Sequence, residues 1–241
     1  MQGPIYVALS GQIALERRME TLARNVANLS TVGYRADEVK FETILSQAGR
    51  DLVAFASTGP NYISRQAGAV SHTGNPLDLA IEGDGWFAVE TGNGPAYTRD
   101  GRFTIDEAGQ LRTIAGYLVL DAGLAPIQLD PDAGTPVIAR DGMIMQDGQQ
   151  AGAVGLFRID PAANMRRFEN SAVVPDIPAE AVLDFVGAGM VQGYTEGSNV
   201  NPVLEMTRLI MVQRAFESAA TAIDQNDRSR QDAIRTLGDP R

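Results

Sequence analysis

The sequence predicts an α+β fold in which a helix at each end of the chain accompanies a central all-β domain. Apolar residues recur at alternating spacings of three and four between residues 4 and 30, and again after about residue 202. This period is typical of amphipathic helices. Between about residues 76 and 194 the period changes to two, and turn signals rich in glycine follow one another at short intervals, as in an all-β domain.

The composition indicates a globular, acidic protein. The chain has 241 residues, of which 44% are hydrophobic and 21% are charged, so it can bury a core. Its formal net charge of −10 repels nucleic-acid phosphates and anionic lipids, and we expect neither as a partner. Because there is no cysteine, disulfides and thiolate chemistry are excluded. No apolar run approaches the roughly 20 residues that span a bilayer, so we expect no membrane insertion.

Residues 1–32 are predicted to form the N-terminal helix. Pro4 suits the first turn, where its missing N–H costs nothing, and Gly33 offers a stop signal. The apolar stripe is as narrow as the seam of a coiled coil. On this helix the expected interface consists of Ile5, Leu15, Met19, Leu22, Val26 and Leu29.

Residues 200–241 are predicted to form the C-terminal helix. Asn201 is a good N-cap, Pro202 fits the first turn, and Glu205 complements the helix dipole. Because a lone helix of this length is marginally stable in water, we expect the two end helices to pair as a coiled coil. Other copies or other proteins should cover the remaining apolar surface. On this helix the expected interface consists of Leu209, Val212, Phe216, Ala219 and Ile223.

The segment between the N-terminal helix and the β domain, residues 33–75, is predicted to be an extended connector with short strands. Its composition is rich in Gly, Ser, Thr, Asn and Pro. We expect Gly33 to adopt a positive φ, which glycine tolerates best, and to act as a hinge between helix and connector.

Residues 76–199 are predicted to form the β domain. Two strands should flank Gly83-Asp84-Gly85, and a hairpin is expected around Asp100-Gly101. Two further Asp-Gly turns are expected at Asp141-Gly142 and Asp147-Gly148.

The sequence carries no pattern that predicts a catalytic, metal or cofactor site. His72, the single histidine, lies in a loop, and no G-x-S-x-G motif accompanies it. Asp100, Asp106 and Glu107 could be read as the carboxylate pair of a glycosidase, but each is better explained by a turn. The segment 130–141 begins like a calcium loop, yet it lacks both the sharp-turn glycine and the final glutamate.

Four segments together resemble the bacterial flagellar rod and hook proteins. ARNVANLSTVGYR (residues 23–35) is similar to that family's N-terminal signature. TGNPLDLAIEGDGWFAV (73–89) and YTRDGRFTID (97–106) are similar to its central segments, and residues 193–223 resemble its C-terminal signature. They occur in order between residues 23 and 223, so the resemblance is specific.

The resemblance implies a structural protein, not an enzyme, and no cofactor. Family members pass unfolded through the flagellar export apparatus without a cleaved signal peptide and assemble in the periplasm. Their paired helices form the inner tube of the rod, a drive shaft that transmits torque, and their β domains form its wall. The expected partners are copies of the chain and other rod proteins. The opening residues favour a proximal-rod subunit over a distal-rod or hook-type subunit; the remote alternative is a secreted carbohydrate-active enzyme.

Overall fold

The computed structural model describes residues 3–46 and 53–238, and the chain divides into two compact units. The first unit combines segments from both ends of the chain, Met1–Ala27, Asp37–Tyr62 and Asn201–Arg241. The second unit consists of Asn28–Ala36 and Ile63–Val200.

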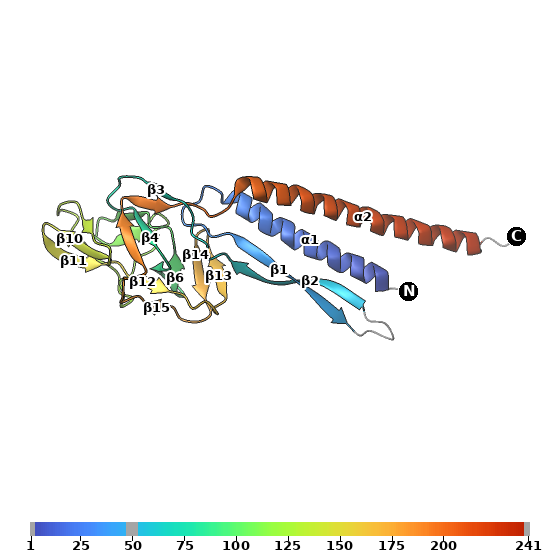
Figure 1. Cartoon of the computed structure of the whole chain (residues 1–241), viewed down its shortest axis with the longest axis horizontal. Coiled ribbons are helices and arrows are strands. Elements are labelled where there is room, and N and C mark those ends of the chain that lie inside the picture. Colours follow the sequence, from blue (N-terminus) through green and yellow to red (C-terminus); the bar gives the residue numbers. More distant parts are fainter. Residues whose placement is uncertain (1–2, 47–52, 239–241) are drawn as a thin grey trace. The chain divides into compact units, whose positions relative to one another are not determined.

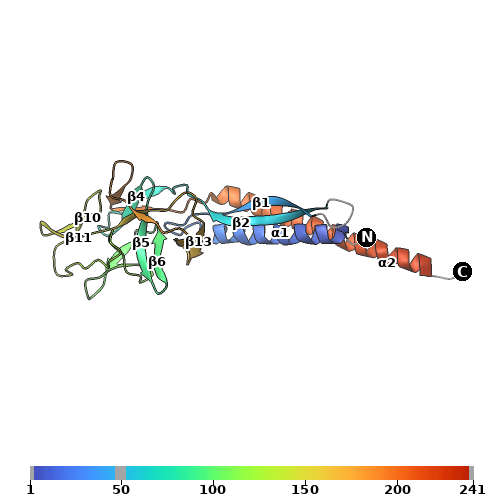
Figure 2. The same cartoon turned by 90° about the horizontal axis from the view of Figure 1, so that it is seen from below.

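Two helices dominate the first unit. α1 (Gly3–Ala27) and α2 (Pro202–Gly238) lie side by side (Figures 1 and 2). Together with the strands described below, they confirm the predicted α+β class. α1 is shorter than predicted, because residues 28–30 form a turn and do not continue the helix.

The start of α2 is as the sequence predicts. Pro202 is its first residue, and the Asn201 side-chain oxygen accepts a hydrogen bond from the backbone N–H of Leu204 at 3.1 Å. This contact satisfies one of the backbone donors that a helix leaves free at its N-terminus.

A β-hairpin completes the first unit. β1 (Asp37–Ser46) and β2 (Val53–Ile63) pair with each other, and β1 lies beside α1 (Figure 2). These strands of 10 and 11 residues replace the short strands expected in this segment. Gly59 and Pro60 do not end β2, since both strands of a two-stranded ribbon are edges, where a proline need not donate to a ladder.

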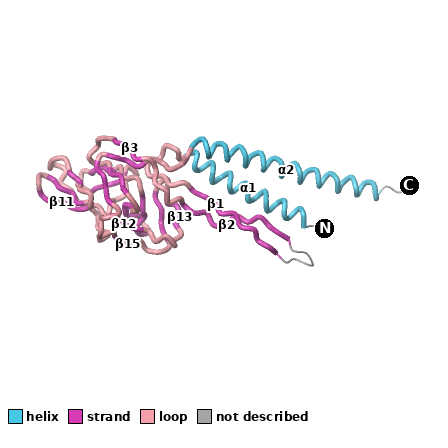
Figure 3. Tube along the Cα trace, viewed as in Figure 1, coloured by secondary structure: helices cyan, strands magenta, loops and turns pink. Residues whose placement is uncertain are grey.

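The second unit is built from short strands joined by turns and loops (Figure 3). Its largest sheet has the strand order β13-β14-β6-β5-β12-β15; the smaller ones are β11-β10-β9, β16-β4, β17-β3 and β7-β8. The strands are β3 (Val70–His72), β4 (Leu79–Glu82), β5 (Trp86–Thr91), β6 (Gly94–Thr98), β7 (Phe103–Ile105), β8 (Leu111–Thr113), β9 (Val137–Ile138), β10 (Met143–Gln146), β11 (Gln149–Ala153), β12 (Leu156–Arg158), β13 (Met165–Phe168), β14 (Ala172–Pro175), β15 (Glu180–Ala181), β16 (Gly189–Gln192) and β17 (Tyr194–Glu196).

The core of this unit lies on both faces of β5. Phe87 belongs to one buried cluster with Leu79 and Phe103, whereas its neighbour Trp86 belongs to another with Tyr97. Successive side chains of a strand point to opposite faces, so a strand buried on both sides reads as a continuous apolar run. This explains why WFAV is apolar without alternation.

Three of the predicted turns are confirmed, and one predicted hairpin is wrong. Strands β4 and β5 flank Gly83, and tight turns occur at Asp141-Gly142 and Asp147-Gly148. At the last of these, both residues have positive φ, 48° and 77°, as a two-residue hairpin turn of type I′ requires.

Asp100-Gly101 does not join a hairpin. β6 pairs with β5 and β14, whereas β7 pairs with β8. The Gly101 carbonyl accepts a hydrogen bond from the backbone N–H of Leu79 at 2.9 Å, which directs the chain toward β4 instead of back along β6. This long-range bond has no local sequence signal.

Candidate functional site

The predicted interface residues of the two helices lie on protected surfaces of α1 and α2. Leu22 is 6% exposed and Val212 is 4% exposed, so both are buried within the chain. The side chain of Ile5 lies outside the described residues. The remaining members are half-buried, with Leu29 in the turn after α1: Leu15, Met19, Val26, Leu29, Leu209, Phe216, Ala219 and Ile223.

A second set of large apolar side chains on the helices is exposed. On α1 these are Leu9 and Ile13. On α2 they are Val203, Leu204, Met206, Ile210 and Met211. Packing of α1 against α2 therefore leaves a good deal of apolar helix surface uncovered, and exposed apolar patches are typical of sites at which proteins contact one another.

Asn25 ties three elements of the helical unit together. Its side-chain oxygen accepts a hydrogen bond from the backbone N–H of Asp37 at 2.9 Å, and its Nδ2 donates to the Asp37 carbonyl oxygen at 2.9 Å. Nδ2 also donates to the Glu205 carboxylate at 3.2 Å. Asn25 and Glu205 are buried. One amide thus joins the end of α1 to the starts of β1 and α2.

Charged neighbours surround this amide. The Arg24 guanidinium lies 3.0 Å from the Asp37 carboxylate, and Arg208 lies 2.7 Å from the Glu205 carboxylate. The interface prediction did not include Asn25. Asn25 could have been identified from its position in the sequence, because it is a polar residue three positions after Leu22, within the apolar stripe of the helix.

In the second unit, the Glu196 carboxylate lies between two arginines. Oε1 is 2.7 Å from Nη2 of Arg35, and Oε2 is 3.0 Å from Nη1 of Arg99. The backbone N–H of Gly68 also donates to Oε1, at 2.9 Å. All three charged side chains are buried, so this cluster holds two cations and one anion away from water.

Trp86 and backbone carbonyls complete the surroundings of the two arginines. Their guanidinium carbons lie 5.8 Å (Arg35) and 5.5 Å (Arg99) from the Trp86 ring centre. Nη2 of Arg99 donates to the Gly83 carbonyl at 2.8 Å. Burial lowers the pKa of Arg35 to about 10, although Glu196 acts in the opposite direction. Arg35 therefore stays charged at neutral pH.

Gly33 adopts the positive φ that the sequence predicts, 69°. Its backbone N–H donates to the Glu196 carbonyl at 2.7 Å. A Cβ at this position would lie 2.2 Å from the backbone nitrogen of Asp100. Glycine is therefore needed here for two reasons, the backbone conformation and the close approach of another strand end.

Three family models match separate segments of the chain. Residues 5–35 match the family model described as flagella basal body rod protein. Residues 80–146 match the flagellar hook protein FlgE/F/G D1 domain, and residues 191–236 match the flagellar basal body rod FlgEFG protein C-terminal model.

Full-length relatives agree. The flagellar basal-body rod protein FlgF of Mesorhizobium japonicum is 54% identical over 99% of both chains, and FlgF of Rhizobium meliloti is 47% identical over the whole of both. The chain belongs to the flagellar basal-body rod protein family. The rod protein FlgG of Bacillus subtilis is 32% identical over 95% of this chain and 97% of its own.

Membership of the rod family makes this chain a structural subunit of the flagellar basal body that interacts with other rod or hook proteins. It is not an enzyme. The remote alternative, a carbohydrate-active enzyme, is therefore set aside. Of the carboxylates concerned, Asp100 pairs with Arg102 and Asp106 with Arg112, and Arg112 holds the pKa of the Asp106 carboxyl below its ordinary value.

His72, which the sequence analysis placed in a loop, belongs to a strand instead. His72 lies on β3, and its ring contacts that of Tyr194 at 4.8 Å between centres. In the described ranges, no three metal-ligating side chains gather into a group, and neither helix has the apolar length to cross a bilayer.

The three rod-family segments meet around Glu196. Arg35 ends the first matched segment, Trp86 and Arg99 lie in the second, and Glu196 lies in the third. The segments that define the family are thus held to one another by the buried ionic cluster, within one unit. Local sequence patterns could not predict that these distant segments contact one another.

Proposed function

We propose that this chain is a proximal-rod subunit that polymerises through its paired terminal helices as part of the flagellar drive shaft. The FlgF proteins of Mesorhizobium japonicum and Rhizobium meliloti support the proximal position, because they are 54% and 47% identical over the full length, against 32% for the FlgG of Bacillus subtilis; the FlgF of Caulobacter vibrioides is 34% identical. A distal-rod or hook-type role is less well supported.

The observation that carries this proposal is the division of apolar surface on the two helices. The residues around Leu22 and Val212 pack within the chain, in a pairing that we propose is a coiled coil. Residues such as Ile13 and Met211 face solvent. We infer that neighbouring subunits cover this exposed apolar set, because the packing of the two helices against each other leaves it in water.

The assembly route follows from the same proposal. The chain leaves the cytoplasm through the export apparatus without a cleaved signal peptide and joins copies of itself and other rod proteins in the periplasm. Gly33, at the exit from the turn after α1, serves as the hinge between the helical and β portions of the sequence.

A charge on the exposed helix surface tests this function. Met211 is 64% exposed, so Met211→Asp should leave helix content unchanged, as measured by circular dichroism. In the rod the charge would be buried without a partner, which costs several kcal/mol. We expect loss of the variant from purified basal bodies and loss of swimming.

The matched control is Gln225→Asp, which places the same charge at an exposed polar position of α2. It should assemble and swim normally. Normal incorporation of Met211→Asp would show that this helix surface is not an interface.

A further inference from the structure

Two of the exposed apolar side chains on α2 carry sulfur. Met206 is 49% exposed and Met211 is 64% exposed. The other methionines whose side chains the structure describes are half-buried or buried: Met19, Met143, Met145, Met165 and Met190. A thioether that meets water also meets dissolved oxidants, so the two methionines of α2 are the accessible ones in the described part of the chain.

Both methionines belong to the apolar surface of α2 that the packing against α1 leaves uncovered. Residues three and four apart are neighbours on a helix, so Met206 lies beside Val203 and Ile210. Met211 follows Leu204 by seven positions, which brings it to the same face two turns later. All five side chains are exposed. The two sulfur atoms are therefore part of the surface that would contact neighbouring subunits.

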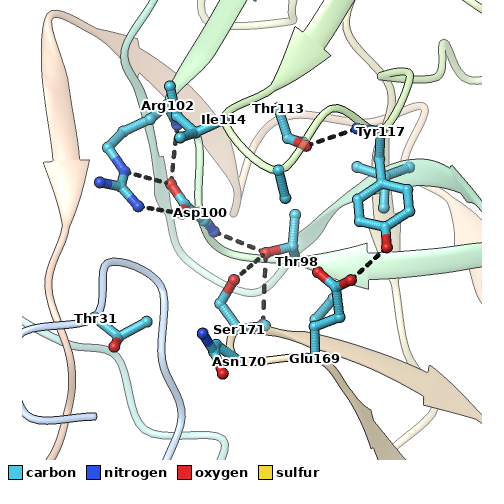
Figure 4. Close-up of a pocket in the computed structure, with 13 residues that line it drawn as sticks. Thr31, Thr98, Asp100, Arg102, Thr113, Ile114, Tyr117, Glu169, Asn170 and Ser171 are labelled. Atoms are coloured by element: carbon cyan, nitrogen blue, oxygen red, sulfur yellow. Dashed lines mark hydrogen bonds and ion pairs between the residues drawn. The ribbon is translucent and has the colours of Figure 1, made fainter.

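Other parts of the chain offer an oxidant few competing targets. There is no cysteine, so the methionine thioethers are the only side-chain sulfur atoms. The single tryptophan, Trp86, is 2% exposed. The open pocket of the β unit beside Thr98 and Tyr117 holds no thioether, because none of the described residues that line it is a methionine (Figure 4). Oxidation of the folded chain is thus directed to α2.

We propose that Met206 and Met211 form an oxidation site that controls whether a free subunit can join the rod. The reagent is a two-electron oxidant of the peroxide class. The thioether sulfur attacks one peroxide oxygen, an S–O bond forms as the O–O bond breaks, and the second oxygen leaves as water after proton transfer. Sulfur is oxidised to the sulfoxide and the peroxide is reduced, so the step needs no further reactant.

The product is a polar side chain on an apolar surface. In the free chain its oxygen is solvated by water, so the fold stays unchanged. Between subunits the same oxygen would be buried without a donor, which lowers incorporation by roughly tenfold for each sulfoxide. A sulfoxide reductase that supplies two thiol equivalents restores the thioether. The inference rests on the proposed function, because it assumes that neighbouring subunits cover this surface.

Peroxide treatment of the purified full-length chain tests the oxidation site itself. After a brief exposure to dilute hydrogen peroxide, peptide mass spectrometry gives the sulfoxide fraction at each methionine. Met206 and Met211 should oxidise well before Met190, which is 3% exposed, and circular dichroism should not change. Oxidation of Met190 at the same rate as the two methionines of α2 would overturn the inference.

A competition within one cell tests the control of assembly. Met206→Leu/Met211→Leu keeps apolar side chains of similar volume and removes both sulfur atoms. Cells that make this variant and the wild-type chain together are given peroxide while rods form, and each form is compared with its own incorporation without peroxide. The wild-type chain should lose incorporation in proportion to its oxidised fraction, whereas the variant should keep its untreated level. Wild-type chains in new basal bodies should also carry less sulfoxide at both positions than free chains.

The matched control is Met143→Leu/Met165→Leu, because both residues are half-buried in the β unit. This variant should lose incorporation on peroxide treatment as the wild type does. Protection of the control, or undiminished wild-type incorporation although free chains carry sulfoxide at Met206 and Met211, would overturn the inference. The proposed function would survive either result if the wild-type chain was incorporated and the cells were motile. Normal incorporation of Met211→Asp would contradict both, because the surface would then not be an interface.

Discussion

The Arg35 guanidinium and the Glu196 carboxylate form an ion pair of 2.7 Å, in which both side chains are 1% exposed. Arg35 lies near the N-terminal helix in the sequence, and Glu196 lies shortly before the C-terminal helix. Their pair therefore joins the two segments of the β unit, close to the C-terminal end of each, since these segments are Asn28–Ala36 and Ile63–Val200. The pair is enclosed, so its integrity matters more than that of any surface ion pair.

Glu196→Gln should destabilise the β unit strongly. The variant leaves Arg35 and Arg99 buried without their shared anion, and breaking one partner of a buried pair costs about 3–5 kcal/mol. The fluorescence of Trp86, the single tryptophan, reports unfolding at the cluster itself. The control Glu82→Gln removes an exposed pair with Arg140 and should cost less than about 1 kcal/mol. Equal midpoints for the two variants in denaturant would contradict this prediction.

Gly33→Ala should be more damaging than Gly148→Ala. Both glycines have positive φ, 69° and 77°, so both variants incur about 1–2 kcal/mol of backbone strain. Only at Gly33 does a Cβ also meet backbone, 2.2 Å from the Asp100 nitrogen, whereas nothing lies within 4 Å at Gly148. We expect an additional loss of about 1–3 kcal/mol at Gly33, measured by thermal unfolding. Equal losses of stability in Gly33→Ala and Gly148→Ala would mean that the backbone of residues 99 and 100 moves aside without cost.

Asn25→Ala should loosen the junction of α1, β1 and α2. The variant removes both hydrogen bonds to Asp37 and the one to Glu205, leaving buried groups unsatisfied at about 1–3 kcal/mol each. The local measurement is amide exchange at the Asp37 N–H, which should become much faster. Asn93→Ala, in the exposed turn between β5 and β6, is the matched control and should leave this rate unchanged. Unaltered protection of Asp37 in Asn25→Ala would rule out the proposed joint.

Leu22→Asp should reduce the helix content of the isolated chain. Leu22 is buried within the helical unit, and an unpaired charge there costs several kcal/mol. Circular dichroism checks the result, with the exposed neighbour variant Ala23→Asp as control. The contrast with Met211→Asp separates two roles: Leu22 is buried within one chain, whereas we propose that the exposed Met211 serves contacts between chains. Native helix content in Leu22→Asp would place its side chain outside the packed surface.

The two helices, the N-cap at Asn201, the positive φ of Gly33 and the Asp-Gly turn at residues 147 and 148 could all be predicted from the sequence. Each depends on interactions between residues a few positions apart, so a short stretch of sequence contains its cause. The narrow stripe also identified Leu22 and Val212 as buried. The domain limits and the interface role of the seam remain predictions.

The long-range joints could not be predicted in this way. The Asp-Gly pair at Gly101 predicts a hairpin turn, but the Gly101 carbonyl accepts a hydrogen bond from the backbone N–H of Leu79. In the sequence nothing distinguishes Glu196 from the other acidic residues, whereas in the structure Arg35 and Arg99 flank its carboxylate. A charged residue is usually solvated, and only a partner from a distant segment makes its burial tolerable. Local periodicity therefore suffices for helices, caps and turns. The path of the whole chain decides which distant charged residues and glycines meet. Contacts between them contribute to stability only when the tertiary structure brings them together and excludes water around them.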